Sequence, residues 1–338
     1  MQIVHQTAPS DPTAPAVSAV VPCYNEELVL ETLLSRLVAA CEIVAGNDFE
    51  IILVDDGSSD RTREMMHAAH TRDPRISAVF LSRNHGHQLA LTAGLSVARG
   101  LRIFILDADL QDPPELLAPM MARMDEGFDV VYGKRATRAN ETVFKRATAS
   151  AFYRLLERIV DVKIPLDTGD FRLISRRVAD VLAAMPEQHR FIRGMVSWVG
   201  FAQTAFPYDR EERFAGETKY PFRKMLLLAV DAITGFSVVP LRIASTLGLL
   251  VSTLAILLAV VFFFAWLAGS VVPGWTSLAL IVLLLGGVQL IVVGILGEYV
   301  GRLYMQSKQR PIFVIEDVLR ALPVTPATPN REEVERHG

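Results

Sequence analysis

The chain has 338 residues, 21% of them charged, and a formal net charge of −3. This length allows one large domain and a smaller part, and the charge gives no support for nucleic-acid binding. Two cysteines, Cys23 and Cys41, cannot make a disulfide framework, so we expect buried thiols in a reducing compartment. The N-terminus lacks the pattern of a signal peptide, and its first 15 residues and the tail at 321–338 have the composition of disordered segments.

Short apolar runs alternate with helical patterns along the first part of the chain. Residues 30–44 and 86–98 have the spacing of amphipathic helices. Five runs predict buried strands: 16–22, 50–54, 75–81, 102–106 and 129–133. Apolar strands that alternate with helices are typical of an α/β fold with a mostly parallel sheet covered on both faces.

Polar clusters follow four of these strands: PCYNEE, DDGSSD, SRNHGHQ and DADLQD. The carboxyl ends of parallel strands meet at one edge of a sheet, where ligands bind in such folds. We therefore expect the four clusters to line one crevice.

The last cluster contains a carboxylate pair. In extended backbone Asp107 and Asp109 would share a face, and they would repel each other unless a cation lay between them. Mg²⁺ or Mn²⁺ held by few protein ligands leaves its other positions to water and substrate phosphates, which predicts a diphosphate ligand. Asp56 could accept a base N–H and Tyr24 could stack on a base. Rossmann and P-loop motifs are missing, and His85 with its neighbour two residues on lacks a third ligand for zinc.

No charged residue occurs between Ile243 and Gly297. This run is long enough for two membrane spans, predicted over 240–302, with a break at 268–275. Basic residues flank the run but not the break: Arg242, Arg302, Lys308 and Arg310. The positive-inside rule then places both ends in the cytosol. A buried hairpin of core helices is the alternative, and it would need a far larger soluble partner.

Two amphipathic segments flank the hairpin. Residues 220–238 are predicted to form an interfacial helix on the cytosolic membrane surface. Residues 303–320 form a cytosolic juxtamembrane segment, and whether it lies on the membrane or packs on the soluble domain is left open.

Seven motifs occur in a definite order: VVPCYNEE, ILVDDGSSDRT, LSRNHGHQLALTAGL, ILDADLQDPPE, DVVYGKR, DTGDFRLISR and AGETKYPFRKM. Together they resemble the family 2 glycosyltransferases with the GT-A fold, and more narrowly the polyprenyl-phosphate glycosyltransferases such as bactoprenol glucosyltransferases and dolichol-phosphate mannose synthases. The resemblance implies a GT-A catalytic domain over 16–219. It also implies metal-dependent, inverting transfer of a sugar from a nucleotide donor to a polyprenyl phosphate in the membrane.

The resemblance also implies roles for single residues. Asp107 and Asp109 are the metal motif for Mg²⁺ or Mn²⁺, with Asp109 as the direct ligand and Gln111 in support. The donor's nucleoside part is assigned to Pro22, Tyr24, Glu26 and Asp56, with Asp107 beside them. Phosphates of the donor or the lipid are assigned to Arg135, Arg213 and Lys219.

Asp170, in the motif TGDF, is the acceptor-side carboxylate and the family's candidate general base. A phosphate monoester has a second pKa of about 6, so at neutral pH most of the acceptor is already a dianion that needs no base. We therefore predict that Asp170 acts mainly by positioning.

The favoured donor is UDP-glucose and the favoured acceptor is undecaprenyl phosphate at the inner membrane, with the catalytic domain and both termini in the cytosol. GDP-mannose, UDP-N-acetylglucosamine and a UDP-modified arabinose remain open as donors. A processive polysaccharide synthase is disfavoured because no Q-x-x-R-W motif occurs and one hairpin cannot form a conduit. A catalytically dead scaffold is disfavoured by the intact carboxylate motifs. A homo-oligomer formed through the hairpin is left open.

Overall fold

The structure, a computed structural model, describes residues 13–136, 165, 168–210, 237–268 and 274–321. Its strands are β1 Val17–Cys23, β2 Phe49–Asp55, β3 Ile76–Leu81, β4 Arg102–Ile105, β5 Val130–Arg135, β6 Thr168–Ser175, β7 Gln203–Tyr208 and β8 Ile315–Leu319. Its α-helices are α1 Leu30–Ala45, α2 Thr62–Arg72, α3 His87–Val97, α4 Leu117–Asp125, α6 Arg176–Ala184, α7 Ile192–Val199, α9 Val239–Leu267 and α10 Trp275–Ser307. A 3₁₀ turn, η1, covers Pro114–Leu116.

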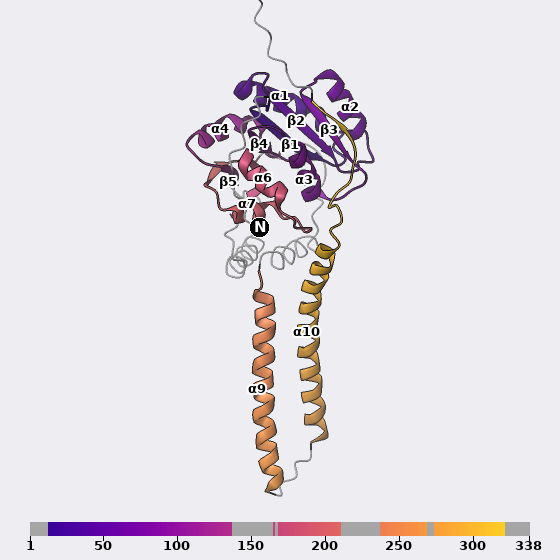
Figure 1. The fold of residues 1–338 in the computed structure, drawn as a ribbon, viewed down its shortest axis with the longest axis vertical. Coiled ribbons are helices and arrows are strands. Elements are labelled where there is room, and N and C mark those ends of the chain that lie inside the picture. Colours follow the sequence, from indigo (N-terminus) through magenta and orange to yellow (C-terminus); the bar gives the residue numbers. More distant parts are fainter. Residues whose placement is uncertain (1–12, 137–164, 166–167, 211–236, 269–273, 322–338) are drawn as a thin grey trace, which may run out of the picture.

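The strands form one sheet in the order β7-β5-β6-β4-β1-β2-β3-β8 (Figure 1). Strands β1 to β4 are parallel, while β6 runs antiparallel to both β4 and β5 and β8 runs antiparallel to β3. The sheet is therefore mixed and mostly parallel, as the apolar runs predicted.

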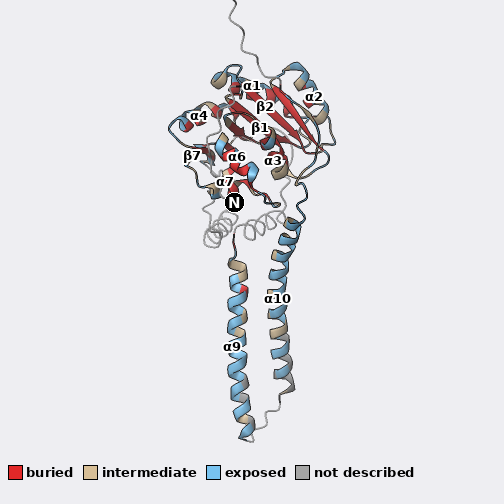
Figure 2. Cartoon of the chain, in the orientation of Figure 1, coloured by how far each residue is buried: buried red, intermediate tan, exposed pale blue. Residues whose placement is uncertain are grey.

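Each face of the sheet carries its own hydrophobic core, because side chains of a strand point alternately to opposite faces. Strand β1 shows the alternation: Ala19 and Val21 pack with α1, α2 and α4, whereas Val20 packs with α3, α6 and α7. Figure 2 shows the buried strands between these helices. The loops at the carboxyl ends of the parallel strands are left to form the site.

The five predicted strands are confirmed to within about two residues at each end, and α1 and α3 match the two predicted helices. Strands β6, β7 and β8 are additional to the prediction. Strand β8 lies within the segment 303–320 and pairs with β3 at the edge of the sheet, which answers the question left open for this segment: it packs on the catalytic domain.

Helices α9 and α10 extend side by side away from the domain and are largely exposed (Figures 1 and 2). Both contain apolar stretches long enough to cross a bilayer, Val239–Ala265 and Leu284–Ser307, with mean hydropathies of 2.8 and 1.7. Neither stretch is covered by the described part of the protein, with 0% of the residues in each window buried. The alternative of a buried core hairpin is therefore not supported. The proposed interfacial helix at 220–238 lies almost wholly outside the described residues.

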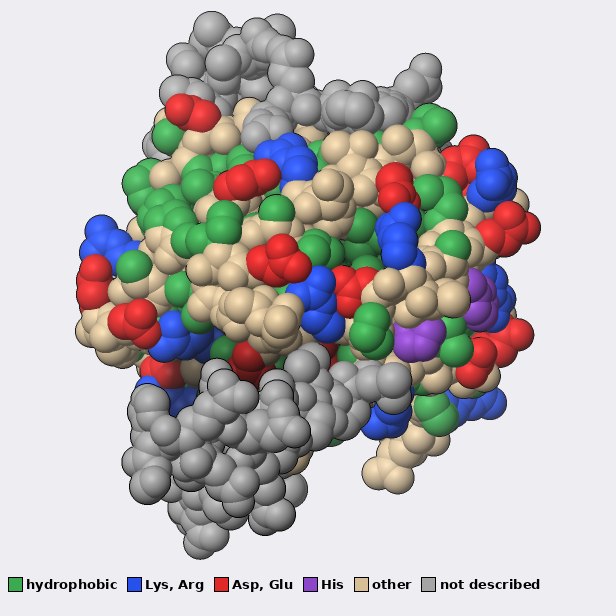
Figure 3. All heavy atoms as spheres, turned by 90° about the horizontal axis from the view of Figure 1, so that it is seen from above, with side chains coloured by type: hydrophobic (Ala, Val, Ile, Leu, Met, Phe, Trp, Pro, Cys, Tyr) green, Lys and Arg blue, Asp and Glu red, His purple; other side chains and the backbone are tan. Residues whose placement is uncertain are grey.

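The C-terminal end of α10 is joined to the domain by hydrogen bonds. The side chain of Gln306 donates to the carbonyl of Pro186 at 2.7 Å and accepts the backbone N–H of Gln188 at 3.0 Å. Gln188 in turn donates from its side chain to the carbonyl of Arg310 at 2.9 Å. The face of the domain turned away from the helices carries interspersed acidic and basic side chains (Figure 3), as expected for a surface in water.

Candidate active site

The antiparallel pairing of β4 with β6 brings two of the predicted site residues together. Ile105 lies opposite Arg172 in this ladder. Continued two residues past Ile105, the same register sets Asp107 opposite Asp170. The chain leaves β4 before the carboxylate pair and turns, with Leu110 in the left-handed region at φ 57°. Asp107 and Asp109 therefore lie in a turn, and the extended backbone assumed from their spacing is not present there.

Asp170 is buried and held by three side chains. Arg193 of α7 donates to it from Nε at 3.0 Å and from Nη2 at 3.3 Å. Gln88 of α3 donates to its Oδ2 at 2.8 Å, and His87 Nε2 lies 3.2 Å from the same oxygen. Burial alone would raise the pKa of this carboxyl, but the charge of Arg193 and the contact with His87 hold the pKa well below its usual value. Asp170 is consequently an ionised group that its neighbours fix in place.

His87 lies between the two carboxylates, with Nε2 also 3.4 Å from Oδ1 of Asp107. Burial lowers its pKa, but the charges of Asp107 and Asp170 outweigh burial and raise the pKa to about 9. The ring is therefore protonated at neutral pH and shares its positive charge with both carboxylates. Burial raises the pKa of Asp107, and the nearby charges of Asp170 and Asp109 add to the increase while His87 opposes it.

Asp109 and Asp112 face a further cation, Arg210. The guanidinium lies 4.0 Å from Oδ2 of Asp109 and 3.5 Å from Oδ1 of Asp112. Asp112 is fully buried and accepts the hydroxyl of Tyr208. Burial, followed by the charge of Asp107, raises the pKa of Asp112. The carboxylates of Asp107, Asp109, Asp112 and Asp170 thus converge with the cations His87, Arg193 and Arg210, and Arg172 of β6 lies 3.8 Å from Asp170.

The residues present suit a divalent cation that is shared with a substrate. Oδ1 of Asp107 is buried and makes no hydrogen bond within the described part of the chain. Carboxylate oxygens are the ligands that Mg²⁺ and Mn²⁺ prefer. Among the described residues no three His, Cys, Asp or Glu side chains cluster as a complete metal site, so an ion here would take further oxygens from phosphate and water. Gln111 contributes its backbone N–H to Oδ1 of Asp109 at 3.2 Å, and the supporting role of its side chain stays a prediction.

The four residues predicted for the nucleoside lie at the ends of β1 and β2. Pro22 is buried within β1, and Tyr24 follows that strand with 42% of its surface exposed, so its ring is accessible for stacking. The backbone N–H of Glu26 donates to the hydroxyl of Thr62.

Asp56 holds the loop that precedes α3. Its carboxylate accepts the backbone N–H groups of His85 at 2.7 Å and Gly86 at 2.9 Å, directly before α3. Burial nevertheless raises its pKa. Asp56 therefore fixes the loop that presents His87, and its contact with a base stays a prediction.

Of the three residues predicted for phosphates, only Arg135 lies within the described residues. It ends β5, next to Gly169, whose Cβ position would lie 3.6 Å from Nη2 of Arg135. Its Nε is buried and has no hydrogen-bond partner in the part of the chain that the structure describes. Arg213 and Lys219 lie outside the described residues.

Sequence reasoning missed the cations that surround the carboxylates: His87, Arg193 and Arg210, together with the amide of Gln88. His87 was considered only for zinc, and the structure separates the two histidines, because His85 uses its backbone on Asp56 while His87 points at Asp107 and Asp170. The polar cluster SRNHGHQ after β3 was the sequence feature that could have pointed to His87. Arg193 lies in the run RFIRGM, which belongs to the resemblance but follows none of the predicted strands.

A mixed sheet with helices on both faces and a carboxylate cluster at its strand ends is the architecture of a GT-A glycosyltransferase. Residues 18–182 match the family model described as Glycosyl transferase family 2. The chain belongs to this family, and the protein is a glycosyltransferase.

Relatives match nearly the whole chain. The uncharacterized glycosyltransferase YkcC of Bacillus subtilis is 47% identical over 300 residues, which are 88% of this chain and 93% of that protein. The prophage bactoprenol glucosyl transferase homolog of Escherichia coli is 39% identical over 308 residues, 89% of this chain and 99% of that protein. Among solved structures, glucosyl-3-phosphoglycerate synthase of Mycobacterium tuberculosis in complex with Mn²⁺, UDP and phosphoglyceric acid is 18% identical, with a TM-score of 0.42, over 65% of this chain and 76% of that one.

Proposed function

We propose that the enzyme transfers a sugar from a nucleotide donor, with UDP-glucose as the favoured donor, to undecaprenyl phosphate. The observation that carries this proposal is the match to relatives named bactoprenol glucosyl transferase, which extends over almost their full length and so includes the two apolar helices. An acceptor with a polyprenyl tail explains why a catalytic domain is joined to a membrane hairpin.

Asp109 and Asp107 would hold Mg²⁺ or Mn²⁺ on the donor's diphosphate. When bound, the ion neutralises the charge that develops on the leaving nucleoside diphosphate. Arg210 and Arg135 lie beside the same cluster and supply further positive charge for phosphate oxygens. Tyr24 would offer its exposed ring to the base. The sugar's anomeric carbon would be attacked from the opposite face by the acceptor phosphate, which inverts it.

Asp170 would position groups rather than remove a proton. Its pKa is held well below the usual value, so it is a weak base, and both of its oxygens are already bonded to Arg193, Gln88 and His87. Its charge keeps two cations, Arg193 and His87, beside the acidic cluster, which consists of Asp107, Asp109, Asp112 and Asp170. These cations screen the carboxylates from an approaching phosphate dianion, which they would otherwise repel.

The sheet supports a topology in which both ends of the hairpin lie on one side of the inner membrane. Strand β8 follows α10 and pairs with β3, and Arg63 adds an ion pair to Glu316 at 2.7 Å. This pairing requires that α10 return to the side from which α9 departs. Basic residues at both ends favour the cytosol for that side. The acceptor's phosphate would then be reached from the cytosolic leaflet.

The alternatives make different predictions for one experiment. The full-length enzyme is supplied with UDP-glucose, GDP-mannose, UDP-N-acetylglucosamine or a UDP-arabinose derivative, together with undecaprenyl phosphate in detergent, and lipid-linked product is measured. We expect metal-dependent product with UDP-glucose and none with Asp109→Asn. Product from another donor alone would change the assigned sugar, polymer without lipid acceptor would indicate a synthase, and no turnover with any donor would indicate a scaffold.

A further inference from the structure

A cavity lies between the catalytic domain and the segment that follows α10. Its volume is about 350 Å³. It is bounded by α3, the end of α6, the loop from α6 to α7, and residues 311–313. Most of the side chains that line it are apolar, among them Leu95, Leu182, Met185, Ile192, Ile312 and Phe313. The volume is at the lower end of the range for ligand pockets, about 300–1,000 Å³, and suits one chain of a ligand rather than a bulky ring system.

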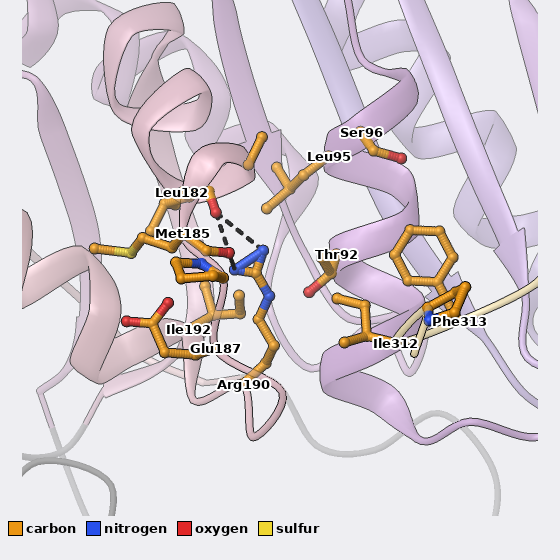
Figure 4. Close-up of a pocket in the computed structure, with 13 residues that line it drawn as sticks. Thr92, Leu95, Ser96, Leu182, Met185, Glu187, Arg190, Ile192, Ile312 and Phe313 are labelled. Carbon is orange, nitrogen blue, oxygen red and sulfur yellow. Dashed lines mark hydrogen bonds between the residues drawn. The ribbon is translucent and has the colours of Figure 1, made fainter. Parts of the chain in front are cut away.

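Two buried polar side chains, those of Thr92 and Arg190, lie within this apolar lining. Arg190 is 9% exposed. Nη1 and Nη2 donate to the carbonyl of Leu182 at 2.9 and 3.0 Å, and Nη1 also donates to the carbonyl of Met185 at 3.2 Å. Nε is buried and has no hydrogen-bond partner within the described residues. In Figure 4 the side chain runs between Leu182 and Met185 on one side and Thr92 and Ile312 on the other. A buried donor without a partner costs free energy unless a ligand supplies an acceptor.

The cavity lies directly beside the end of a membrane helix. Pro186 lines it, and the carbonyl of Pro186 accepts the side chain of Gln306 in the last turn of α10. The lining residues 311–313 follow that helix after a few residues. An apolar pocket at this position is within reach of molecules that reside in the bilayer.

We propose that this cavity binds one hydrocarbon chain of a membrane lipid, with an ester or phosphate oxygen of the lipid accepting the hydrogen of Arg190 Nε. The chain could come from a bulk phospholipid or from a polyprenyl phosphate, and both share this chemistry. The site is separate from the acidic cluster and does not depend on sugar transfer.

Occupancy would be transmitted to the candidate active site through Ile192. Its side chain lines the cavity, and its backbone N–H donates to Gln88 at 2.9 Å. Gln88 donates to Asp170 at 2.8 Å. A hydrocarbon chain packed against Ile192 would stabilise the start of α7, and with it the position of Arg193.

Photo-crosslinking in lipid nanodiscs tests the site without any donor sugar. The full-length protein is placed in nanodiscs that contain either a phosphatidylglycerol with a diazirine in one acyl chain or an undecaprenyl phosphate analogue with a diazirine in its isoprenoid chain. Labelled peptides are mapped by mass spectrometry. We expect label on the α3, 182–190 and 311–313 peptides, in addition to label on α9 and α10. Label from the phospholipid probe would identify bulk lipid as the source, and label from the isoprenoid probe would identify the acceptor.

Ser96→Trp fills the mouth of the cavity from an exposed position on α3, and should reduce label on the cavity peptides about tenfold while leaving label on α9 and α10 unchanged. Ser35→Trp, the same change at an exposed position of α1 on the other face of the sheet, is the matched control and should label like the wild type. Arg190→Lys keeps the charge but removes the Nε donor and should also label less. The proposal is overturned if neither probe labels the cavity peptides, or if Ser96→Trp labels as strongly as Ser35→Trp.

Discussion

Replacing Arg193 with Met should expose the electrostatic coupling that holds Asp170. The change removes two hydrogen bonds from a buried carboxylate, at 3.0 and 3.3 Å, and leaves those from Gln88 and His87. Hydrogen bonds to charged groups contribute about 1.5–3 kcal/mol, and complete loss of a buried partner costs about 3–5 kcal/mol. Because these two contacts and the charge of Arg172, 3.8 Å from Asp170, remain, we expect Arg193→Met to lower the free energy of unfolding by about 1.5–3 kcal/mol.

A double-mutant cycle distinguishes this coupling from a general packing defect. Once Asp170→Asn has removed the charge, the Met side chain no longer faces an ionised carboxyl. The double variant Arg193→Met/Asp170→Asn should therefore cost less than the sum of the single variants by about 1 kcal/mol or more. Unfolding of the full-length protein in detergent, followed by tryptophan fluorescence, measures the three costs. Arg83→Met, at an exposed arginine, is the control and should change stability by less than about 0.5 kcal/mol. Additive costs would refute the assigned ion pair.

Three further predictions concern the metal motif, the role of Asp170 and the thiols. Asp109→Asn should abolish EDTA-sensitive transfer and weaken Mn²⁺ binding, which electron paramagnetic resonance measures in the presence of UDP. The temperature of thermal unfolding should stay within a few degrees of the wild type. Full activity in the variant or in EDTA would contradict the metal role. The rate defect of Asp170→Asn should change little between about pH 6 and about pH 8.5, across the range in which the acceptor loses its own proton; a defect that is large at the acid end and shrinks as pH rises would instead identify a base. Burial raises the pKa of Cys23 well above its usual value and that of Cys41 to about 12. Iodoacetamide at about pH 8 should therefore label neither thiol until denaturant is added. Rapid labelling of the folded protein would show that one of the thiols is accessible.

The strands that could be predicted from the sequence are those buried on both faces. Continuous apolar runs such as that of β1 have few other structures open to them in a soluble domain. Strand β6 escaped prediction because Asp170 and Arg172 interrupt its apolar pattern, and both are charged because they face the site. Strand β8 lies at the edge of the sheet, where Glu316 and Asp317 are tolerated and no apolar run is required.

Without the family resemblance, which supplied Asp170, the candidate site was predictable only where its residues follow strands. Asp107 and Asp109 were found because they end a strong apolar run. The contacts of Asp170 depend on the β4–β6 register and on where α3 and α7 begin, neither of which periodicity determines. The role of His87 likewise arises from the folded arrangement, since its sequence neighbours give no sign that Asp107 and Asp170 will lie on either side of the ring.

The position of β8 has a consequence for how the protein is made. The ribosome delivers the partner of β3 only after both apolar helices have been synthesised, because residues 315–319 follow α10. Until then the edge of β3 has open backbone hydrogen-bonding groups, which can pair with other chains. With the proposed membrane topology, the catalytic sheet can therefore be completed only by a polypeptide whose hairpin has already crossed the bilayer and returned. If α10 failed to return across the bilayer, the last strand would be left on the far side of the membrane, and the sheet would remain unfinished.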